Sequence, residues 1–218
     1  DNDFQENTCN DILKKNAECL GYKLTDKDLT IFGNNEFNQY KINFQKINSF
    51  DKKLIFHFDE KWELDEYSKS FKQAIFMTST SINTDDILNL LSDISKKTND
   101  TILITTGTFY TQTFKELLLK SEKLEENFYR IKITNKYVYI LAKLDLFAMI
   151  NLISKSNTLI SCHGAFTHVA NNYNLKIFDI IEKEKSSHYG RITSHMKNYN
   201  KIYRKEFSLI AKEINSQL

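Results

Sequence analysis

Short apolar segments alternate with longer amphipathic ones along most of this chain. The short segments are four to seven residues long and lie at 53–58, 101–107, 128–133, 158–161 and 175–181. Runs of this length are typical of buried strands, whereas the stretches between them repeat apolar residues at helical spacing. Because such alternation produces βαβ crossovers, the sequence predicts an α/β fold with a doubly wound, mostly parallel, Rossmann-like sheet and helices on both faces.

The helices are expected at 64–75, 82–97, 113–124, 144–156, 203–215 and, in a shorter form, from Gly164 to about residue 172. In the second of these, Thr84 can cap the helix. Its apolar face is expected to consist of Ile87, Leu88, Leu91 and Ile94. The inward residues of the helix at 144–156 are expected to be Leu146, Phe147, Ile150 and Ile153.

The first 50 residues have a less regular pattern than the rest. Apolar residues near helical spacing at 6–20 stop at Gly21, which predicts a helix that ends there, and an Asn-rich segment follows. The sequence has no internal repeat and no low-complexity linker. We therefore expect residues 1–50 to form a linker helix with an irregular segment, and residues 51–218 to form one domain with a C-terminal helix. The chain starts with Asp1 rather than Met, so it can be a fragment of a longer protein.

Composition narrows the class of protein. Hydrophobic residues make up 41% and aromatic residues 13%, too much for a disordered chain. Lys and Arg number 30 against 28 Asp and Glu, a net charge of +2, which argues against a nucleic acid as the main partner. The three cysteines have no framework spacing, no apolar run could span a bilayer, and the N-terminal segment is too polar for a signal peptide. These features predict a cytoplasmic protein with free thiols.

Ligands of doubly wound sheets bind beyond the carboxyl ends of the strands. That rule selects four loops, at 57–62, 105–111, 140–145 and 161–168. The last loop contains the most distinctive residues. Gly164 can adopt backbone angles closed to other residues and leaves no Cβ in the way, and Ala165 continues the small surface.

The same loop predicts an anion site. The N–H groups of Ala165, Phe166 and Thr167 are expected in the first turn of a helix, where free amides and the helix dipole attract anions. The Thr167 hydroxyl adds a donor. His163 and His168 can donate to phosphate oxygens and are the candidate catalytic residues, because they can offset charge on a departing diphosphate.

Each of these features has a simpler alternative. A glycine between a strand and a helix is common for packing reasons, and His168 can be a hydrogen-bonded core histidine. Cys162, His163 and His168 lack a fourth ligand and match no zinc spacing, so no metal is expected.

Candidate binding residues in the other three loops have alternatives as well. Lys61 can reach phosphates as a point charge, or it can be a solvated loop lysine. Thr106 and Gly107 resemble a hydroxyl-lined phosphate turn, although Thr is also simply a good strand residue. Leu141 and Lys143 can form a wall against a nucleobase, or Leu141 can belong to the core.

Two segments resemble a known family. The sequence LAKLDLFAMINLISKSNTLISCHGAFTHVANNYNLKIFDI (141–180) resembles the nucleotide-binding half of GT-B-type glycosyltransferases, particularly the ADP-heptose:lipopolysaccharide heptosyltransferases. LIFHFDEKWELDEYSKSF (54–71) resembles that family's strand, loop and helix in which a Lys precedes a Trp. The resemblance covers roughly 50–182. It departs from the family where Cys162 and His163 replace an acid, and its His-Gly-Ala triplet is also similar to xylosyl- and N-acetylglucosaminyltransferases.

The resemblance implies site residues and partners. Lys61 looks like the family's diphosphate-contacting lysine, Gly164 like its turn glycine, His168 like the histidine that follows, and 141–143 like its base-side segment. The implied function is that of a donor-binding domain that uses a nucleotide-diphospho-sugar as substrate and no cofactor, in polysaccharide biosynthesis. The implied acceptor is a glycan or a lipid-linked molecule, with transient contact to a membrane surface. GT-B enzymes have two such halves, so an N-terminal acceptor half is expected to be missing.

Two other functions remain open on the sequence. The first is a non-catalytic α/β interaction module in which the glycine turn is structural. The second is a hydrolase or epimerase that uses His163 or His168 as acid or base, although no G-x-S-x-G elbow supplies a nucleophile.

Overall fold

The computed structural model describes residues 18, 21, 23, 45–63, 80–107 and 109–218. The helix expected at 64–75 lies outside these residues, and so does nearly all of the helix expected at 6–20. Most of the expected linker segment 1–50 lies outside them as well.

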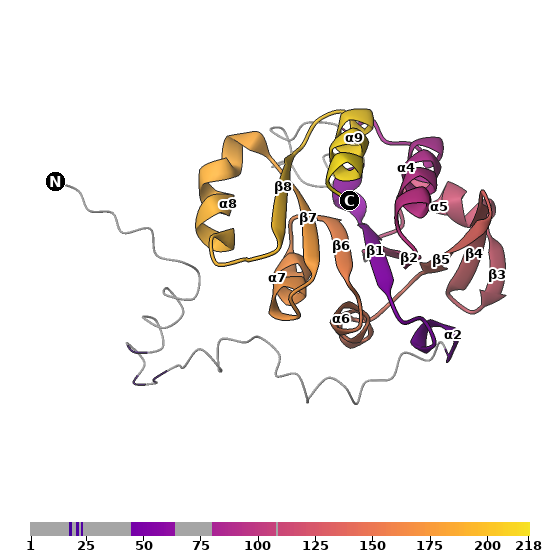
Figure 1. Cartoon of the computed structure of the whole chain (residues 1–218), viewed down its shortest axis with the longest axis horizontal. Helices are drawn as coiled ribbons and strands as arrows, with labels where there is room; N and C mark the ends of the chain where they lie inside the picture. Colours follow the sequence, from indigo (N-terminus) through magenta and orange to yellow (C-terminus); the bar gives the residue numbers. More distant parts are fainter. Residues whose placement is uncertain (1–17, 19–20, 22, 24–44, 64–79, 108) are drawn as a thin grey trace.

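Eight strands form one sheet in the order β3-β4-β5-β2-β1-β6-β7-β8 (Figure 1). Six of them are parallel neighbours, namely β5 (Lys136–Leu141), β2 (Thr101–Thr106), β1 (Lys53–Phe58), β6 (Thr158–Cys162), β7 (Lys176–Ile181) and β8 (Tyr199–Tyr203). An antiparallel hairpin of β3 (Glu122–Glu125) and β4 (Phe128–Ile133) extends the sheet beyond β5. The predicted mostly parallel α/β fold is therefore confirmed.

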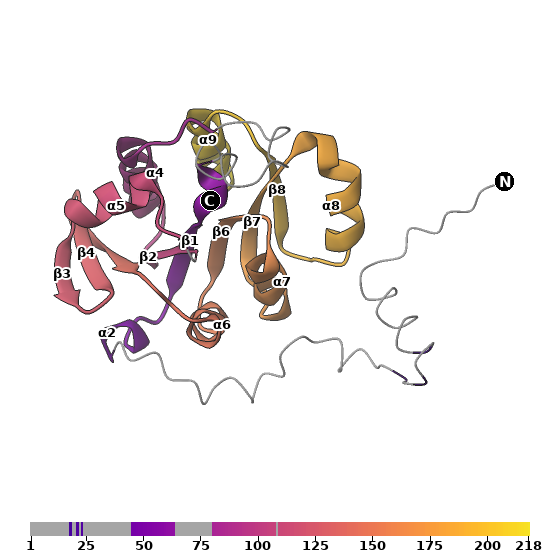
Figure 2. The ribbon, with the colours of Figure 1, turned by 180° about the vertical axis from the view of Figure 1, so that it is seen from behind.

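Helices cover both faces of this sheet (Figures 1 and 2). One face is covered by α4 (Thr84–Lys97), α5 (Gln112–Leu119) and α9 (Phe207–Gln217). The other face is covered by α2 (Gln45–Asn48), α6 (Leu146–Ser154) and α7 (Ala165–Asn172). The short helices η2 (Glu60–Trp62) and η4 (Lys183–Lys185) and the helix α8 (Ser186–Thr193) complete the described elements.

The central strand β1 shows why the strand sequences are continuously apolar. Leu54 and Phe56 belong to the core on the α4 face, whereas Ile55 belongs to the core on the α6 face. All six residues of β1 are buried. A strand with both faces covered by helices is apolar at nearly every position, rather than at alternate ones, and in β1 the polar exceptions are Lys53 and His57.

Three strands were not predicted. β5 was expected to belong to a loop at its end, β8 takes Tyr203 from the expected last helix, and β3 takes the end of the expected helix 113–124. In β3 the reason is a cross-strand contact. Glu122 pairs with Arg130 of β4, and Arg130 Nε lies 2.6 Å from its carboxylate. Pairing across a hairpin stabilises a strand whose residues alone favour a helix.

Two helix faces differ from the expectation. Asn83, rather than Thr84, caps α4, because its side chain accepts from the backbone N–H of Asp86 at 3.0 Å. Leu90 is buried in α4, whereas Leu88 is only partly buried. In α6, Leu146 and Phe147 are 53% and 40% exposed, and the buried apolar residues are Met149, Ile150, Leu152 and Ile153. The first turn of α6 therefore does not supply the core contacts that were expected of it.

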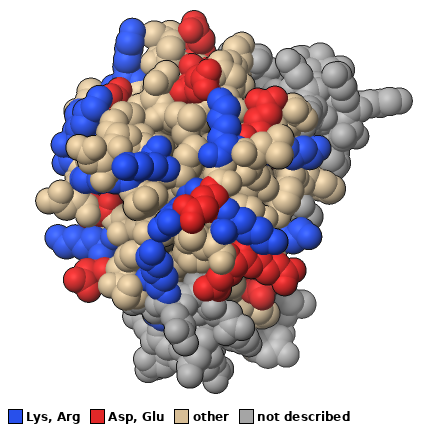
Figure 3. Space-filling view, turned by 90° about the vertical axis from the view of Figure 1, so that its right-hand side faces the viewer, with Lys and Arg blue, Asp and Glu red and all other residues tan. Residues whose placement is uncertain are grey.

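Within the described residues, no helix is long and apolar enough to span a membrane. Basic and acidic side chains are interspersed across the face drawn in Figure 3. This distribution agrees with the small net charge of +2.

Trp62 is the chain's single tryptophan and links the core to the loop after β1. It is fully buried, its ring centroid lies 5.3 Å from that of Phe56 and 5.8 Å from that of Phe207, and its Nε1 donates to the carbonyl of His57 at 2.9 Å. We expect Trp62→Ala to lower the free energy of unfolding by about 3–5 kcal/mol, because it leaves a cavity. Urea titration followed by circular dichroism measures this loss.

Leu119→Ala is the control for that measurement. Leu119 ends α5 and is 86% exposed, so its truncation should change the free energy of unfolding by less than about 0.5 kcal/mol. Equal urea midpoints for the two variants would contradict the assigned role of Trp62.

Candidate functional site

The order of the parallel strands reverses between β1 and β6. From β1 the chain adds β2 and then β5 on one side, and it then returns to add β6, β7 and β8 on the other side. Connections that leave β1 and β6 therefore diverge at the carboxyl ends of these two strands. In open α/β sheets this switch point is where ligands bind.

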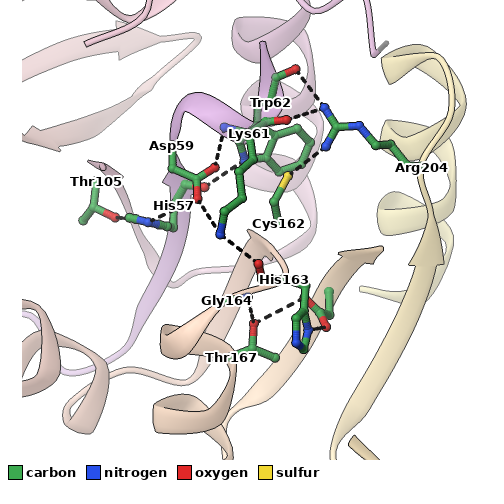
Figure 4. Close-up of polar contacts among 11 residues, drawn as sticks. His57, Asp59, Lys61, Trp62, Thr105, Cys162, His163, Gly164, Thr167 and Arg204 are labelled. Atoms are coloured by element: carbon green, nitrogen blue, oxygen red, sulfur yellow. Dashed lines mark hydrogen bonds and ion pairs between the residues drawn. The ribbon is translucent and has the colours of Figure 1, made fainter. Parts of the chain in front are cut away.

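Lys61 spans the switch point (Figure 4). It lies in η2, directly after β1, and its Nζ donates to the carbonyl oxygen of His163, after β6, at 2.9 Å. Asp59 caps η2 by accepting from the Lys61 backbone N–H at 3.2 Å, and its Oδ2 lies 3.6 Å from Lys61 Nζ. The Lys61 side chain is 31% exposed. A partly exposed ammonium is thus held at the place where the two loops diverge.

Gly164 is required for close approach and not for its backbone angles. Its φ of −179° is extended, a conformation that any residue adopts, so the expected special angles were wrong. A Cβ at this position would lie 2.9 Å from Lys61 Nζ. Glycine therefore makes room for the lysine.

Only some of the hydrogen-bond donors predicted in the first turn of α7 are free of partners in the protein. Thr167 N donates to the carbonyl of Gly164 at 3.1 Å, and the Thr167 hydroxyl donates to Asp179 at 3.3 Å. Thr167 is fully buried, so the prediction that its hydroxyl is free for a ligand was wrong. The amides of Ala165 and Phe166 remain, because the first amides of a helix have no partner within it. Ala165 is exposed and Phe166 is half-buried.

Sequence reasoning missed Asp179, which lies in the middle of β7 and is fully buried. Its carboxylate lies 2.6 Å from His163 Nδ1 and accepts from the Tyr199 hydroxyl at 2.8 Å, in addition to Thr167. Burial, and next the Asp179 carboxylate, raise the pKa of Tyr199. The signal in the sequence was an acid inside an apolar strand, which needs donors around it.

His168 lies one turn into α7, beside His163. The centroids of the two rings are 5.5 Å apart, and the ring of His195 stacks on His168 at 6.4 Å. Burial lowers the pKa of His168, and the two neighbouring histidines lower it further. The neutral form of His168 is thereby favoured.

Two buried titratable groups lie on the β1 side of Lys61. His57 Nδ1 lies 2.8 Å from Thr105 Oγ1, and its Nε2 lies 4.0 Å from Asp59. Burial lowers the pKa of His57 to about 4, and Lys61 contributes. Burial raises the pKa of Asp59, although Lys61 opposes the shift. Both shifts favour the uncharged forms.

The loop after β2 contacts the loop after β1. A Cβ on Gly107 would lie 2.5 Å from Glu60 Oε2 and 3.0 Å from Asp59 Cβ. Thr106 is 7% exposed, and its hydroxyl has no hydrogen-bond partner among the described residues. The structure thus places Thr106 and Gly107 next to the Lys61 loop.

The loop after β5 has no described hydrogen bond or ion pair to the loops that contain Lys61 and Gly164. Leu141 is fully buried in the core on the α6 face, so the expected wall against a nucleobase is wrong for this residue and the core alternative is right. Lys143 is exposed, with a φ of 54°. No described hydrogen bond or ion pair joins Lys143 to Lys61 or Gly164.

Arg204 was also missed. It follows β8, is buried, and donates to the carbonyl of Lys61 and to Cys162 Sγ, the latter at 3.5 Å, while its Nε lies 3.3 Å from Glu182. Burial raises the pKa of the Cys162 thiol, so that thiol is a core group and not a nucleophile. Arg204 therefore holds the backbone of the Lys61 loop.

No group of three or more His, Cys, Asp or Glu residues in the described ranges is arranged to hold a metal ion.

The chain was compared with protein families, curated proteins and solved structures. No protein-family model matches the sequence, and no curated protein is similar to it. A glycosyl transferase family 9 structure from Veillonella parvula DSM 2008 is 8% identical, with a TM-score of 0.44 over 80% of this chain and 40% of that one. A UDP-GlcNAc 2-epimerase from Methanocaldococcus jannaschii is 12% identical, with a TM-score of 0.46 over 94% of this chain and 51% of that one. The chain spans about half or less of the length of either protein.

The depressed pKa of His57 predicts a specific dependence of stability on pH. Between about pH 6.5 and pH 4 the unfolded chain binds a proton at His57 that the folded protein does not, so stability falls as the pH falls through this window. The contribution is about 3 kcal/mol. Urea titrations at pH 7 and at pH 4.5 should show a smaller pH-dependent loss in His57→Asn than in the unsubstituted protein. Identical losses in the two proteins would contradict the assignment.

Proposed function

We propose that this chain binds the diphosphate of a nucleotide-diphospho-sugar at the switch point, as the donor-binding domain of a glycosyltransferase. One observation carries the proposal. The Lys61 ammonium lies over Gly164, at the start of α7, where the strand order of a parallel sheet reverses.

Each part of this arrangement favours an anion. The ammonium supplies a point charge of the kind used for phosphate recognition. The amides of Ala165 and Phe166 and the dipole of α7 favour negative charge at the helix N-terminus. Gly164 keeps side-chain atoms away from the backbone, so phosphate oxygens can approach the amides. Lys61 Nζ donates to the His163 carbonyl, and a phosphate oxygen can replace that carbonyl as the acceptor.

Sugar transfer is the finer step of the proposal, and it is supported by the resemblance of 54–71 and 141–180 to GT-B-type glycosyltransferases. In such a reaction, the acceptor hydroxyl attacks the anomeric carbon and the diphosphate departs with the electron pair of the broken bond. Lys61 and the α7 amides would stabilise the charge that develops on the departing diphosphate. The acceptor, a glycan or a lipid-linked molecule, and the general base would be held by a further domain. A non-catalytic interaction module is the competing function.

Nucleoside diphosphates should stabilise the protein against heat. At a concentration a hundred times the Kd, the melting temperature should rise by about 5–10 °C, because only the folded state binds. Lys61→Ala should weaken binding tenfold or more, since a hydrogen bond to a charged group is lost. UDP, GDP, ADP and CMP are tested by thermal melting and calorimetry, with inorganic pyrophosphate as the base-free probe.

Lys96→Ala is the matched control for Lys61→Ala. Lys96 is an exposed lysine near the C-terminus of α4, paired with Asp93, and its loss should leave binding unchanged. If none of the nucleotides or pyrophosphate binds at millimolar concentration, the proposal is wrong and the interaction module is favoured.

Gly164→Ala should separate binding from folding. The added Cβ meets the mobile end of the Lys61 side chain, so the ammonium can move aside and the free energy of unfolding should change by less than about 1 kcal/mol. Binding of the nucleotide found above should weaken about tenfold. In a Lys61→Ala background the same change should have little further effect, because the two residues act together.

Gly190→Ala is the control for Gly164→Ala. Gly190 lies in α8 with nothing within 4 Å of its added Cβ, so this variant should bind normally and be slightly more stable. Additive losses in the double variant would contradict the coupling between Lys61 and Gly164.

A further inference from the structure

Asp179 and His163 form a charge-assisted hydrogen bond directly beside the proposed phosphate site. His163 Nδ1 lies 2.6 Å from Asp179 Oδ2, and the Asp179 side chain has no exposed surface. A carboxylate has no proton to donate, so Nδ1 must carry one. The other ring nitrogen, Nε2, is then left to interact with a ligand.

His163 joins this pair to the Lys61 site through its own backbone. Its carbonyl oxygen accepts from Lys61 Nζ at 2.9 Å (Figure 4). Its ring Nδ1 lies 2.6 Å from Asp179 Oδ2. The next residue is Gly164. The ring thus belongs to the residue that precedes Gly164, and the missing Cβ of Gly164 makes room for the ammonium.

The surroundings of the ring limit what else can interact with it. The Tyr189 ring lies 4.6 Å from the His163 ring and the His168 ring 5.5 Å from it, and 12% of the His163 side chain is exposed. The Tyr199 hydroxyl donates to the same Asp179 oxygen that lies near the His163 ring. The titratable and charged groups that face His163 are thus Asp179 from β7, His168 from α7, Tyr189 from α8, Tyr199 from β8 and Lys61 from η2.

We propose that Asp179 is a positioning residue that fixes the His163 ring, so that Nε2–H of the protonated ring donates to a phosphate oxygen of the ligand. This inference rests on the proposed function and adds a ligand-binding residue to that site. In the neutral ring, Nδ1–H faces Asp179 and Nε2 is a bare acceptor, which repels a phosphate oxygen. In the protonated ring, Nδ1–H still faces Asp179 and Nε2–H becomes a donor. Ligand affinity should therefore be higher when the His163 ring is protonated than when it is neutral.

The ring geometry can be tested without a ligand. Long-range proton–nitrogen NMR spectra of the 15N-labelled protein distinguish the two neutral tautomers, and the chain has only five histidines. The signal that is missing in His163→Gln identifies the residue. We expect the Nδ1–H tautomer wherever the ring is neutral, because Nδ1 faces the Asp179 carboxylate. The Nε2–H tautomer there would overturn the assignment of Asp179.

The ligand role is tested by the pH dependence of the Kd. ADP and inorganic pyrophosphate are titrated from pH 5.5 to pH 8.5 by calorimetry. Toward the high end of this range, affinity in the unsubstituted protein should fall by up to about tenfold per pH unit relative to His163→Gln. The Gln variant keeps a donor at every pH, so the pH dependence of its Kd reflects the ionisation of the ligand itself.

Two variants separate positioning from packing. Asp179→Asn should weaken binding at pH 6 about tenfold and reduce the change in affinity with pH, because the protonated ring loses its charged partner. Tyr199→Phe removes another donor to Asp179 and should leave that change in affinity with pH unaltered. If Asp179→Asn does not fold, the comparison with His163→Gln decides. Parallel pH profiles in His163→Gln and the unsubstituted protein would overturn the inference while nucleotide binding stands, whereas absence of binding at every pH overturns the proposed function.

Discussion

The reversal of strand order between β1 and β6 is the constraint on which the candidate site depends. Parallel strands point their carboxyl ends to one edge, and the reversal makes the two central connections leave in opposite directions. A side chain from one loop can then reach across to the backbone of the other. Lys61 does so, and its bond to the His163 carbonyl joins segments that are 102 residues apart in the sequence.

The position of Lys61 is fixed by groups that lie in the core. Asp59 caps the turn, Arg204 donates to the Lys61 carbonyl, and Trp62 anchors the end of the turn. Burial shifts the pKa of both His57 and Asp59 toward the uncharged form. The Lys61 ammonium, by contrast, is partly exposed. On the proposed function, it exchanges its carbonyl partner for an anion without moving its backbone.

The periodicity of the sequence was enough to predict the sheet class, the crossovers and which loops share an edge, because these follow from local patterns and from the handedness of βαβ units. The strand β3 (EKLE) was missed because its residues alone favour a helix and its pairing with β4 stabilises it. The strands β5 (KYVYIL) and β8 (YNKIY) were missed although they contain Val, Ile and Tyr residues that favour strands. Gly164 and Lys61 are neighbours, as predicted, but the backbone angles expected of Gly164 are not the reason for the glycine. Gly164 has extended angles, and only coordinates could show that its missing Cβ accommodates Lys61 Nζ.

The buried carboxylate of Asp179 explains why the site offers so few side-chain donors. A carboxylate without solvent contact needs several donors, and it takes them from His163 and Thr167, on either side of Gly164, as well as from Tyr199. The turn is thereby held rigid, but the Thr167 hydroxyl is used up. On the proposed function, the groups at this turn that interact with the ligand are the Lys61 ammonium, the amides of Ala165 and Phe166, and His163 Nε2. Such a set recognises negative charge and not a particular base or sugar. On the proposed function, donor specificity therefore has to come from the other loops of this edge, where the Thr106 hydroxyl has no hydrogen-bond partner among the described residues.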